Sequence, residues 1–191
     1  MNTEKLNALK EQAYQTAVEH GFHEDVKPDV FYLGLVMSEA GEAINADRKG
    51  LHADTKAFEE DEANGLPFAN NFKKHIKDGV EDEIADIVIR LLDFAGLKGY
   101  ELSLISCYQQ SKHLFLRELK KCGLSGVLFQ LMGGLSDNLD VNCIDSGING
   151  LLCIFSDYFG MFTGSDKDLW WFVAKKMQYN EQRPMLNGKK Y

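Results

Sequence analysis

The rarity and position of proline constrain the fold of this chain more than any other feature. Only Pro28, Pro67 and Pro184 occur in 191 residues, and proline is the residue that most strongly disrupts the interior of a helix. The long stretches between these prolines can therefore be helical. No convincing run of alternating apolar and polar residues, bounded by turn residues, indicates a β-strand. We predict an all-α fold, a helical bundle in which residues 1–191 form one domain.

Apolar residues at helical spacing, together with cap residues, predict where the helices lie. Gly21, Gly50 and Gly99 stand where the first three helices should end, in positions typical of a C-terminal cap. The polar stretch Leu51–Lys74 is expected to form a short helix and a loop. The expected helices are Thr3–Glu19, about Asp29–Asp47, about Val80–Leu97, Glu101–Leu124, Ser125–Leu139, Ile144–Phe162 and Asp168–Gln182.

The charge balance and the apolar segments exclude two classes of partner. A net charge of −8 leaves no basic field for non-specific binding to nucleic acid. The apolar segment Ile148–Phe162 is too short to span a membrane and contains Asp157. We therefore expect neither a nucleic acid nor a membrane as a partner.

The cysteines and the N-terminus favour a cytoplasmic protein. The four cysteines have no CxxC spacing and lie inside apolar stretches, so reduced thiols in the core are the better interpretation. Met1–Gln12 carries both acidic and basic residues and lacks the apolar segment of a secretory signal. These observations predict a cytoplasmic location.

Two pairs of carboxylates are more than a plain helical bundle requires. Glu39 and Glu42 lie three residues apart in one expected helix, and Glu83 and Asp86 do so in another. This spacing puts both members of a pair on the same side of a helix, one turn apart. At about 100° of rotation per residue, each pair lies beside the apolar stripe of its helix, and both pairs lie to the same side of that stripe. If the helices pack through these stripes, the four carboxylates can converge at the edge of the core.

Four converging carboxylates repel one another in a cleft of low dielectric constant, so a cation has to compensate them. Oxygen ligands without an accompanying Cys or His favour Mg²⁺, with Mn²⁺ as the alternative, over zinc. Each pair taken alone is more often a set of solvated surface carboxylates on an amphipathic helix. The shared spacing and phase of the two pairs favour the metal site.

Three segments together resemble the MazG-like all-α nucleoside triphosphate pyrophosphohydrolases. Leu35–Ile44 reads LVMSEAGEAI and Glu81–Asp93 reads EDEIADIVIRLLD, which is similar to the ExxE…ExxD signature of that family. Lys176–Pro184 reads KMQYNEQRP and a GKK segment follows, similar to the closing segment of one MazG-like subgroup. The resemblance implies a bundle of the all-α NTP pyrophosphatase type. ExxE alone is common in helices, but the ordered three-part pattern is far more specific.

The resemblance also implies an activity and its residues. Enzymes of the family hydrolyse a nucleoside triphosphate, NTP or dNTP, to the monophosphate and pyrophosphate, often to clear damaged, non-standard or surplus nucleotides. By motif position, Glu39, Glu42, Glu83 and Asp86 would be both the catalytic residues and the ligands of Mg²⁺. A metal that polarises phosphoryl oxygens and activates water suits this reaction, and no separate nucleophile is needed.

The final helix carries groups that suit a polyphosphate. Lys176, Asn180 and Arg183 share one face at spacings of four and three residues. Lysine and arginine both suit phosphate oxygens, although in a last turn they also complement the helix dipole. We expect these three side chains to bind substrate across a cleft from the carboxylates, and Lys189 in the basic tail to close over it.

The segment from about 102 to 165 departs from the family pattern, because short members pass almost directly from the third helix to the last. We predict a helical insertion that either replaces a subunit partner within the chain or enlarges an interface between subunits. Apolar surface of this extent is rarely left exposed. We expect a homo-oligomer, and among homo-oligomers a dimer.

Two other functions remain open from the sequence. A catalytically inert helical interaction module would keep the bundle, but it would be expected to lose at least one of the four carboxylates. A different metal-dependent nucleotide phosphohydrolase on the same scaffold would release orthophosphate instead of pyrophosphate.

Overall fold

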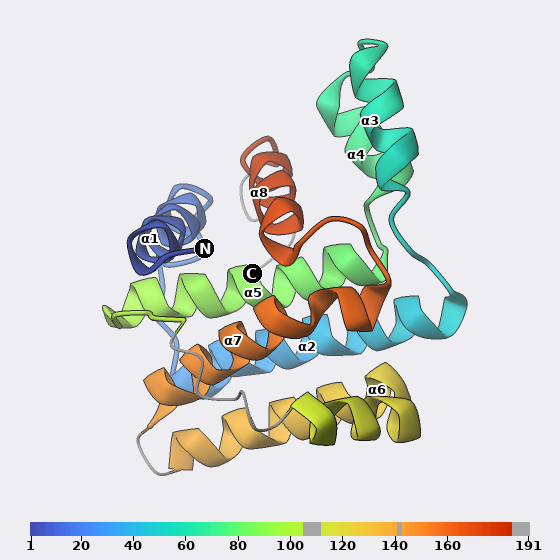
Figure 1. Ribbon diagram of the computed structural model, residues 1–191. Helices are drawn as coiled ribbons and strands as arrows, with labels where there is room; N and C mark the ends of the chain where they lie inside the picture. Colours follow the sequence, from blue (N-terminus) through green and yellow to red (C-terminus); the bar gives the residue numbers. More distant parts are fainter. Residues whose placement is uncertain (105–111, 141–142, 185–191) are drawn as a thin grey trace.

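A computed structural model describes residues 1–104, 112–140 and 143–184, and Figure 1 shows their arrangement. Eight helices and no strand are found among these residues, so the prediction of an all-α fold is confirmed. The helices are α1 (Thr3–Glu19), α2 (Asp29–Lys49), α3 (Thr55–Ala63), α4 (Phe68–His75), α5 (Val80–Lys98), α6 (Lys112–Asp140), α7 (Ile144–Thr163) and α8 (Leu169–Asn180).

Helix α5 lies at the centre of the fold and contacts α1, α2, α7 and α8. Most of its apolar residues recur at helical spacing and are buried, so the apolar side of the helix packs on its neighbours. Gly99 ends the helix in the left-handed conformation with φ 67°, as Gly50 ends α2 with φ 66°. The buried stripe of α5 includes Ile84, Ile87, Val88, Leu91, Leu92 and Ala95.

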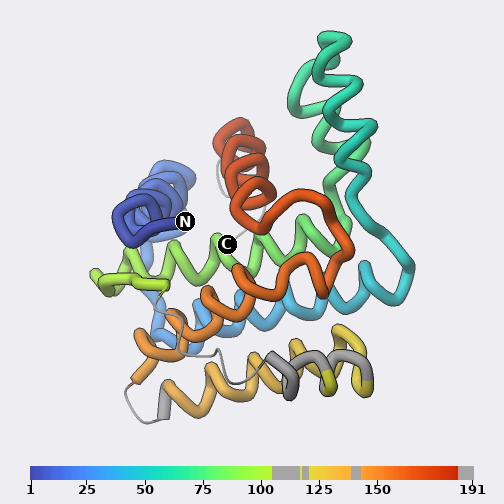
Figure 2. Tube along the Cα trace, in the orientation of Figure 1, coloured from blue at the N-terminus to red at the C-terminus, as the bar shows by residue number. Residues whose placement is uncertain are grey.

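Helices α1 and α8 are far apart in sequence, and both contact α5 from the same side, as the trace in Figure 2 shows. Gln12 Nε2 donates a hydrogen bond of 3.0 Å to Glu181 Oε1, and His20 Nε2 lies 3.0 Å from the carbonyl oxygen of Arg183. Asp168 caps α8 by accepting from the backbone N–H of Trp171 at 2.9 Å. Glu181 and Arg183, just after α8, are thereby held beside α1 and the start of the connector between α1 and α2.

The predicted insertion packs against the first half of the chain. Helix α6 contacts α2 and α7, and α7 contacts α5 and α8. Many apolar side chains of both helices are buried among the described residues, although Phe129 of α6 is 79% exposed. Self-association through this segment stays a prediction. The buried side chains include Leu124, Leu128, Leu135, Ile148, Leu152 and Phe155.

Two details of the insertion differ from the expected helices. Residues 101–104 are not helical, because Asn7 exchanges hydrogen bonds of 2.8 and 3.0 Å with the backbone of Leu102 and holds it against α1. The expected division near Leu124 appears as a kink inside α6, where Gly123 has φ 65° and ψ −174°. Glycine adopts this conformation without the steric penalty that other residues meet.

Smaller differences concern the polar segment and the cysteines. The segment expected as one short helix and a loop forms two helices, α3 and α4, which contact each other. Cys153 is buried as predicted, but Cys122 and Cys143 are exposed, because they lie at the kink of α6 and just before α7. Within the described ranges, no helix has the length and apolar character needed to cross a membrane.

Candidate metal centre and cavity

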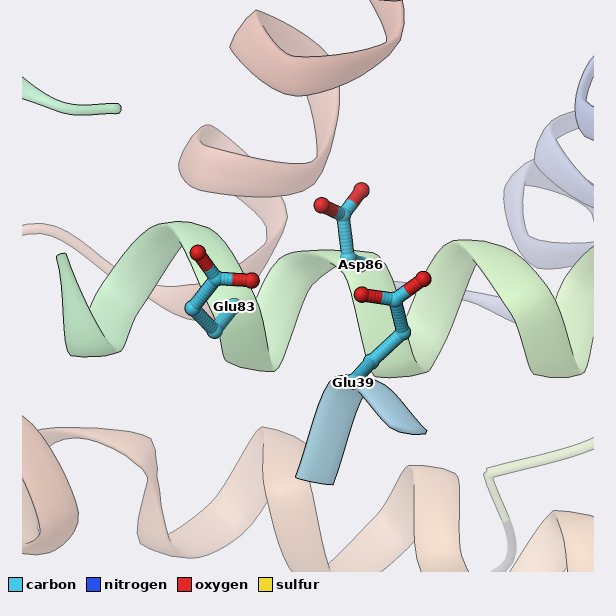
Figure 3. A group of neighbouring side chains, drawn as sticks. All are labelled: Glu39, Glu83 and Asp86. Atoms are coloured by element: carbon cyan, nitrogen blue, oxygen red, sulfur yellow. The ribbon is translucent and has the colours of Figure 1, made fainter. Parts of the chain in front are cut away.

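Three of the four predicted carboxylates meet between α2 and α5. One oxygen each of Glu39, Glu83 and Asp86 lies within 4.8 Å of the others. Figure 3 shows Glu83 and Asp86 one turn apart on α5, with Glu39 reaching them from α2. Glu39 is only 8% exposed and Glu83 only 5%. These three residues, named here the acidic cluster, form a group of hard oxygen donors of the kind that Mg²⁺ prefers.

The fourth predicted carboxylate, Glu42, lies at the rim of the same site. It is exposed, and it lines the cavity that the acidic cluster also lines. Its negative charge is one of the causes that raise the pKa of Glu39 and of Glu83. Glu42 is therefore close enough to act electrostatically on the cluster without belonging to the group of three.

Two cationic side chains, the buried Lys176 and the partly buried Arg90, pair with carboxylates of this site. Lys176 Nζ lies 2.7 Å from Asp86 Oδ2 and 2.8 Å from Asp82 Oδ2. Arg90 Nε donates a hydrogen bond of 3.1 Å to Glu39 Oε1. The predicted phosphate ligand Lys176 thus already holds two carboxylates, which leaves one of its three N–H donors for a phosphate.

Burial and mutual repulsion raise the pKa values of Glu39, Asp82 and Glu83. Burial, followed by the charges of Asp82 and Asp86, raises the pKa of Glu83 to about 8. Burial and the charge of Asp86 raise the pKa of Asp82 to about 6, against the opposing effect of Lys176. The pKa of Glu39 is raised for the same reasons, with Arg90 opposing. Burial alone would lower the pKa of Lys176, but Asp86 and Asp82 raise it above its ordinary value.

The charges at this site do not balance, which fits a divalent cation. Two positive charges, on Lys176 and Arg90, face five carboxylates, which leaves an excess of three negative charges when all five are ionised. The five are Glu39, Glu42, Asp82, Glu83 and Asp86. A second group of possible ligands, Asp78, Asp82 and Glu83, shares Glu83 with the acidic cluster. Asp82 Oδ1 in that group is buried and has no hydrogen-bond partner. A bound cation would supply both the missing charge and a partner for that oxygen.

A cavity of about 680 Å³ opens beside the acidic cluster, within the size range of small-molecule sites. Its walls come from α1, α2, α5, α8 and the connector between α1 and α2. Asn180 and Arg183 line it, so the structure brings the predicted phosphate ligands of α8 to the same cavity as the carboxylates. Asn180 Oδ1 is buried without a hydrogen-bond partner. The expected ligand Lys189 lies outside the described residues.

The guanidinium of Arg183 is available for a ligand. Its backbone is fixed, because the N–H donates to the carbonyl of Asn180 at 3.0 Å and the carbonyl oxygen lies 3.0 Å from His20 Nε2. No ion pair of its side chain is seen within the part of the chain that the structure describes. Arg183 therefore offers a cation on a fixed backbone next to the cavity.

Sequence reasoning missed several groups of the site, although one signal was present. Glu83, Asp86, Arg90 and Asp93 follow one another at spacings of three, four and three residues, so they lie along one face of α5. That spacing alone could have added Arg90 and Asp93 to the site. The pairing of Lys176 with Asp82 could not be foreseen in this way, because it depends on where α8 packs.

The raised pKa values predict how the stability of the metal-free protein depends on pH. The folded protein holds a proton on Glu83 up to about pH 8, whereas the unfolded chain loses it near the ordinary value for Glu. Between these values the folded state binds more protons, so a rise in pH favours unfolding. We expect the melting temperature in EDTA to fall from about pH 5 to pH 8. Saturating Mg²⁺ should remove this fall, and a melting temperature that rises with pH would contradict the assignment.

Comparison of the chain with protein-family models, with curated proteins and with solved structures finds no match. The relation to the MazG-like family therefore rests on the three motifs and stays a prediction.

Proposed function

We propose that this protein is a Mg²⁺-dependent nucleoside triphosphate pyrophosphohydrolase. The observation that carries the proposal is the meeting of Glu39, Glu83 and Asp86 at a cavity that Asn180 and Arg183 also line. Carboxylates on one wall and polar or cationic groups on α8 provide separate places for a cation and for a polyphosphate chain. The test is turnover of a panel of nucleoside triphosphates in Mg²⁺, with the products separated by chromatography.

The acidic cluster would hold the cation, with Glu42 at the rim as a further ligand. When bound, Mg²⁺ would neutralise phosphate charge and lower the pKa of a coordinated water. Arg90 keeps Glu39 in place, and Lys176 keeps Asp86 in place. In the proposed reaction, water attacks the α-phosphorus, the bond from that phosphorus to the α–β bridging oxygen breaks, and pyrophosphate leaves. A carboxylate of the site accepts the proton of the water.

In this proposal, α8 and Arg183 just after it bind the phosphates of the substrate. A triphosphate adds about four negative charges to a site that is already acidic, so cationic groups must meet the β and γ phosphates. Within the described residues the guanidinium of Arg183 forms no ion pair, so it can bind two phosphate oxygens at once. Asn180 can donate from its amide nitrogen, while Lys176 acts chiefly on the carboxylates.

Replacing Arg183 by Ala should raise KM for the triphosphate by about tenfold or more, because a charge-assisted contact to phosphate is lost. Inhibition by pyrophosphate should weaken with it, whereas the affinity for Mg²⁺ should stay nearly unchanged. Steady-state kinetics and metal titration measure the two effects separately. Arg48→Ala, at an exposed position in the last turn of α2, is the matched control. Loss of metal binding with an unchanged KM would contradict this role of Arg183.

The wider assignment follows from the same proposal. We infer a role in clearing damaged, non-standard or surplus nucleotides in the cytoplasm, by a homo-oligomer, with Mn²⁺ able to replace Mg²⁺. The net negative charge of the chain argues against a nucleic-acid partner. The donor set, which contains only oxygen atoms, favours Mg²⁺ or Mn²⁺ over zinc.

A further inference from the structure

The cavity continues well beyond the acidic cluster, and its other end has a different chemical character. Along α5 it is lined from Glu83 to Asp93, a distance of about 15 Å at 1.5 Å per residue. At the second end the walls are Asp93 with three aromatic side chains and a histidine from the connector and α2. This second end, named here the aromatic end, consists of Phe22, His23, Phe31, Tyr32 and Asp93.

A buried histidine and a buried carboxylate pair at the aromatic end. His23 Nε2 lies 2.6 Å from Asp93 Oδ1, and the two side chains are 5% and 11% exposed. The other ring nitrogen, His23 Nδ1, is buried and has no hydrogen-bond partner. A buried polar atom without a partner destabilises a protein, so an unpaired atom beside a cavity suggests that a ligand supplies the partner.

The rings around this pair can hold a flat ligand. The centroid of the His23 ring lies 5.8 Å from that of Tyr32, and the Tyr32 centroid lies 5.5 Å from that of Phe31 in an edge-on arrangement. Arg90 lies over Phe22 with its guanidinium carbon 6.0 Å from the ring centroid. Phe22 and Phe31 are only partly buried, so their faces can still be covered by a ligand. Any nucleic-acid base can stack on such rings, because every base has a flat aromatic face.

None of these groups has a role in breaking a phosphate bond. We propose that the aromatic end binds the base of the nucleotide, a flat nitrogen heterocycle, with His23 Nδ1 as its hydrogen-bonding group and Asp93 as the residue that positions His23. The inference rests on the proposed function, because the phosphates must then lie toward the acidic cluster. With Asp93 ionised, Nε2 carries the proton of a neutral imidazole and Nδ1 is an acceptor, which selects a base edge that presents an N–H.

The first experiment measures binding of the base without any phosphate. Saturation-transfer NMR on the full chain, without metal, tests adenosine, guanosine, cytidine, uridine and thymidine in turn. We expect at least one nucleoside to bind, and we expect Phe31→Ala to weaken that binding by about tenfold. Phe129→Ala, at an exposed position on α6 outside the lining of the cavity, should leave nucleoside binding unchanged. Failure of every nucleoside to bind would overturn the inference.

The second experiment asks whether Asp93 acts through His23. Asp93→Asn keeps the size of the side chain, and its amide can donate to Nε2 and so leave the proton on Nδ1. We expect the ratio of kcat/KM values between bases with an amino edge and bases with a keto edge to change by about tenfold. A purely structural role would lower all values together and leave the ratio unchanged, which would refute the positioning role. Circular dichroism confirms that each variant is folded.

The two proposals fail in different ways. Hydrolysis of triphosphates with KM and base preference untouched by Phe31→Ala and Asp93→Asn would overturn the aromatic end as a base site while leaving the activity in place. Nucleosides that bind through Phe31 and Asp93 to a protein that hydrolyses no triphosphate would support the base site and refute the pyrophosphohydrolase.

Discussion

Glu83→Gln should lower the turnover of nucleoside triphosphates by about 10²-fold or more in saturating Mg²⁺. Glu83 is the one carboxylate shared by both groups of possible ligands, so its replacement removes charge from each of them. Glutamine has nearly the same size and is neutral, as Glu83 itself is over much of the pH range of the metal-free protein. The fold should therefore survive the substitution, and kcat measured beside a metal titration should report the loss of the cation.

Glu60→Gln is the matched control for this experiment, because it changes the same group at an exposed position on α3. It should retain normal turnover. If Glu83→Gln kept near-normal activity at the same Mg²⁺ concentration, Glu83 would not be a metal ligand and the acidic cluster would have to be reassigned.

Lys176→Met should have the largest effect on stability, a loss of about 3–5 kcal/mol in the free energy of unfolding of the metal-free protein. Lys176 is only 4% exposed and lies within hydrogen-bond distance of both Asp82 and Asp86. Removing it leaves the buried Asp82 and the partly buried Asp86 without their cation, which costs more than the original ion pairs contributed. Urea unfolding in EDTA measures the loss, and added Mg²⁺ should restore part of it by binding only the folded state.

Two controls separate the charge effect from the loss of a side chain. Lys56→Met removes an exposed lysine from α3 and should change stability by no more than about 0.5 kcal/mol. The double variant Lys176→Met with Asp82→Asn removes one of the two unpaired charges and should be more stable than Lys176→Met alone. Equal stability of the single and double variants would show that packing, and not charge, explains the effect.

Local signals made much of the fold predictable. The expected helix Thr3–Glu19 agrees with α1 at both ends, because Asn2 caps its start and Gly21 lies just beyond its end. The expected end of the second helix fell two residues short, since Gly50 and not Asp47 sets it. The hydrogen bonds between Asn7 and Leu102 could not be foreseen, because they join residues 95 apart.

In the candidate site, too, some residues could be predicted from the sequence and others could not. Spacing and phase along α2 and α5 predicted that Glu39, Glu83 and Asp86 would converge. Each helix buries an apolar stripe, and the carboxylates lie to the same side of the stripe on both helices. Packing of helices that are distant in sequence brings His23 to Asp93, and no spacing in the chain reports such a contact. The groups missed from the sequence are therefore those that tertiary packing alone brings together.

The most direct measurement of the proposed function follows the oxygen of water through the reaction. The protein is incubated with Mg²⁺, a panel of nucleoside triphosphates and water enriched in ¹⁸O, and the products are separated and weighed by mass spectrometry. The account predicts nucleoside monophosphate that carries one ¹⁸O atom, together with unlabelled pyrophosphate. Neither product should form in EDTA. Release of orthophosphate, label in the pyrophosphate, or no hydrolysis of any nucleotide in the panel would contradict it.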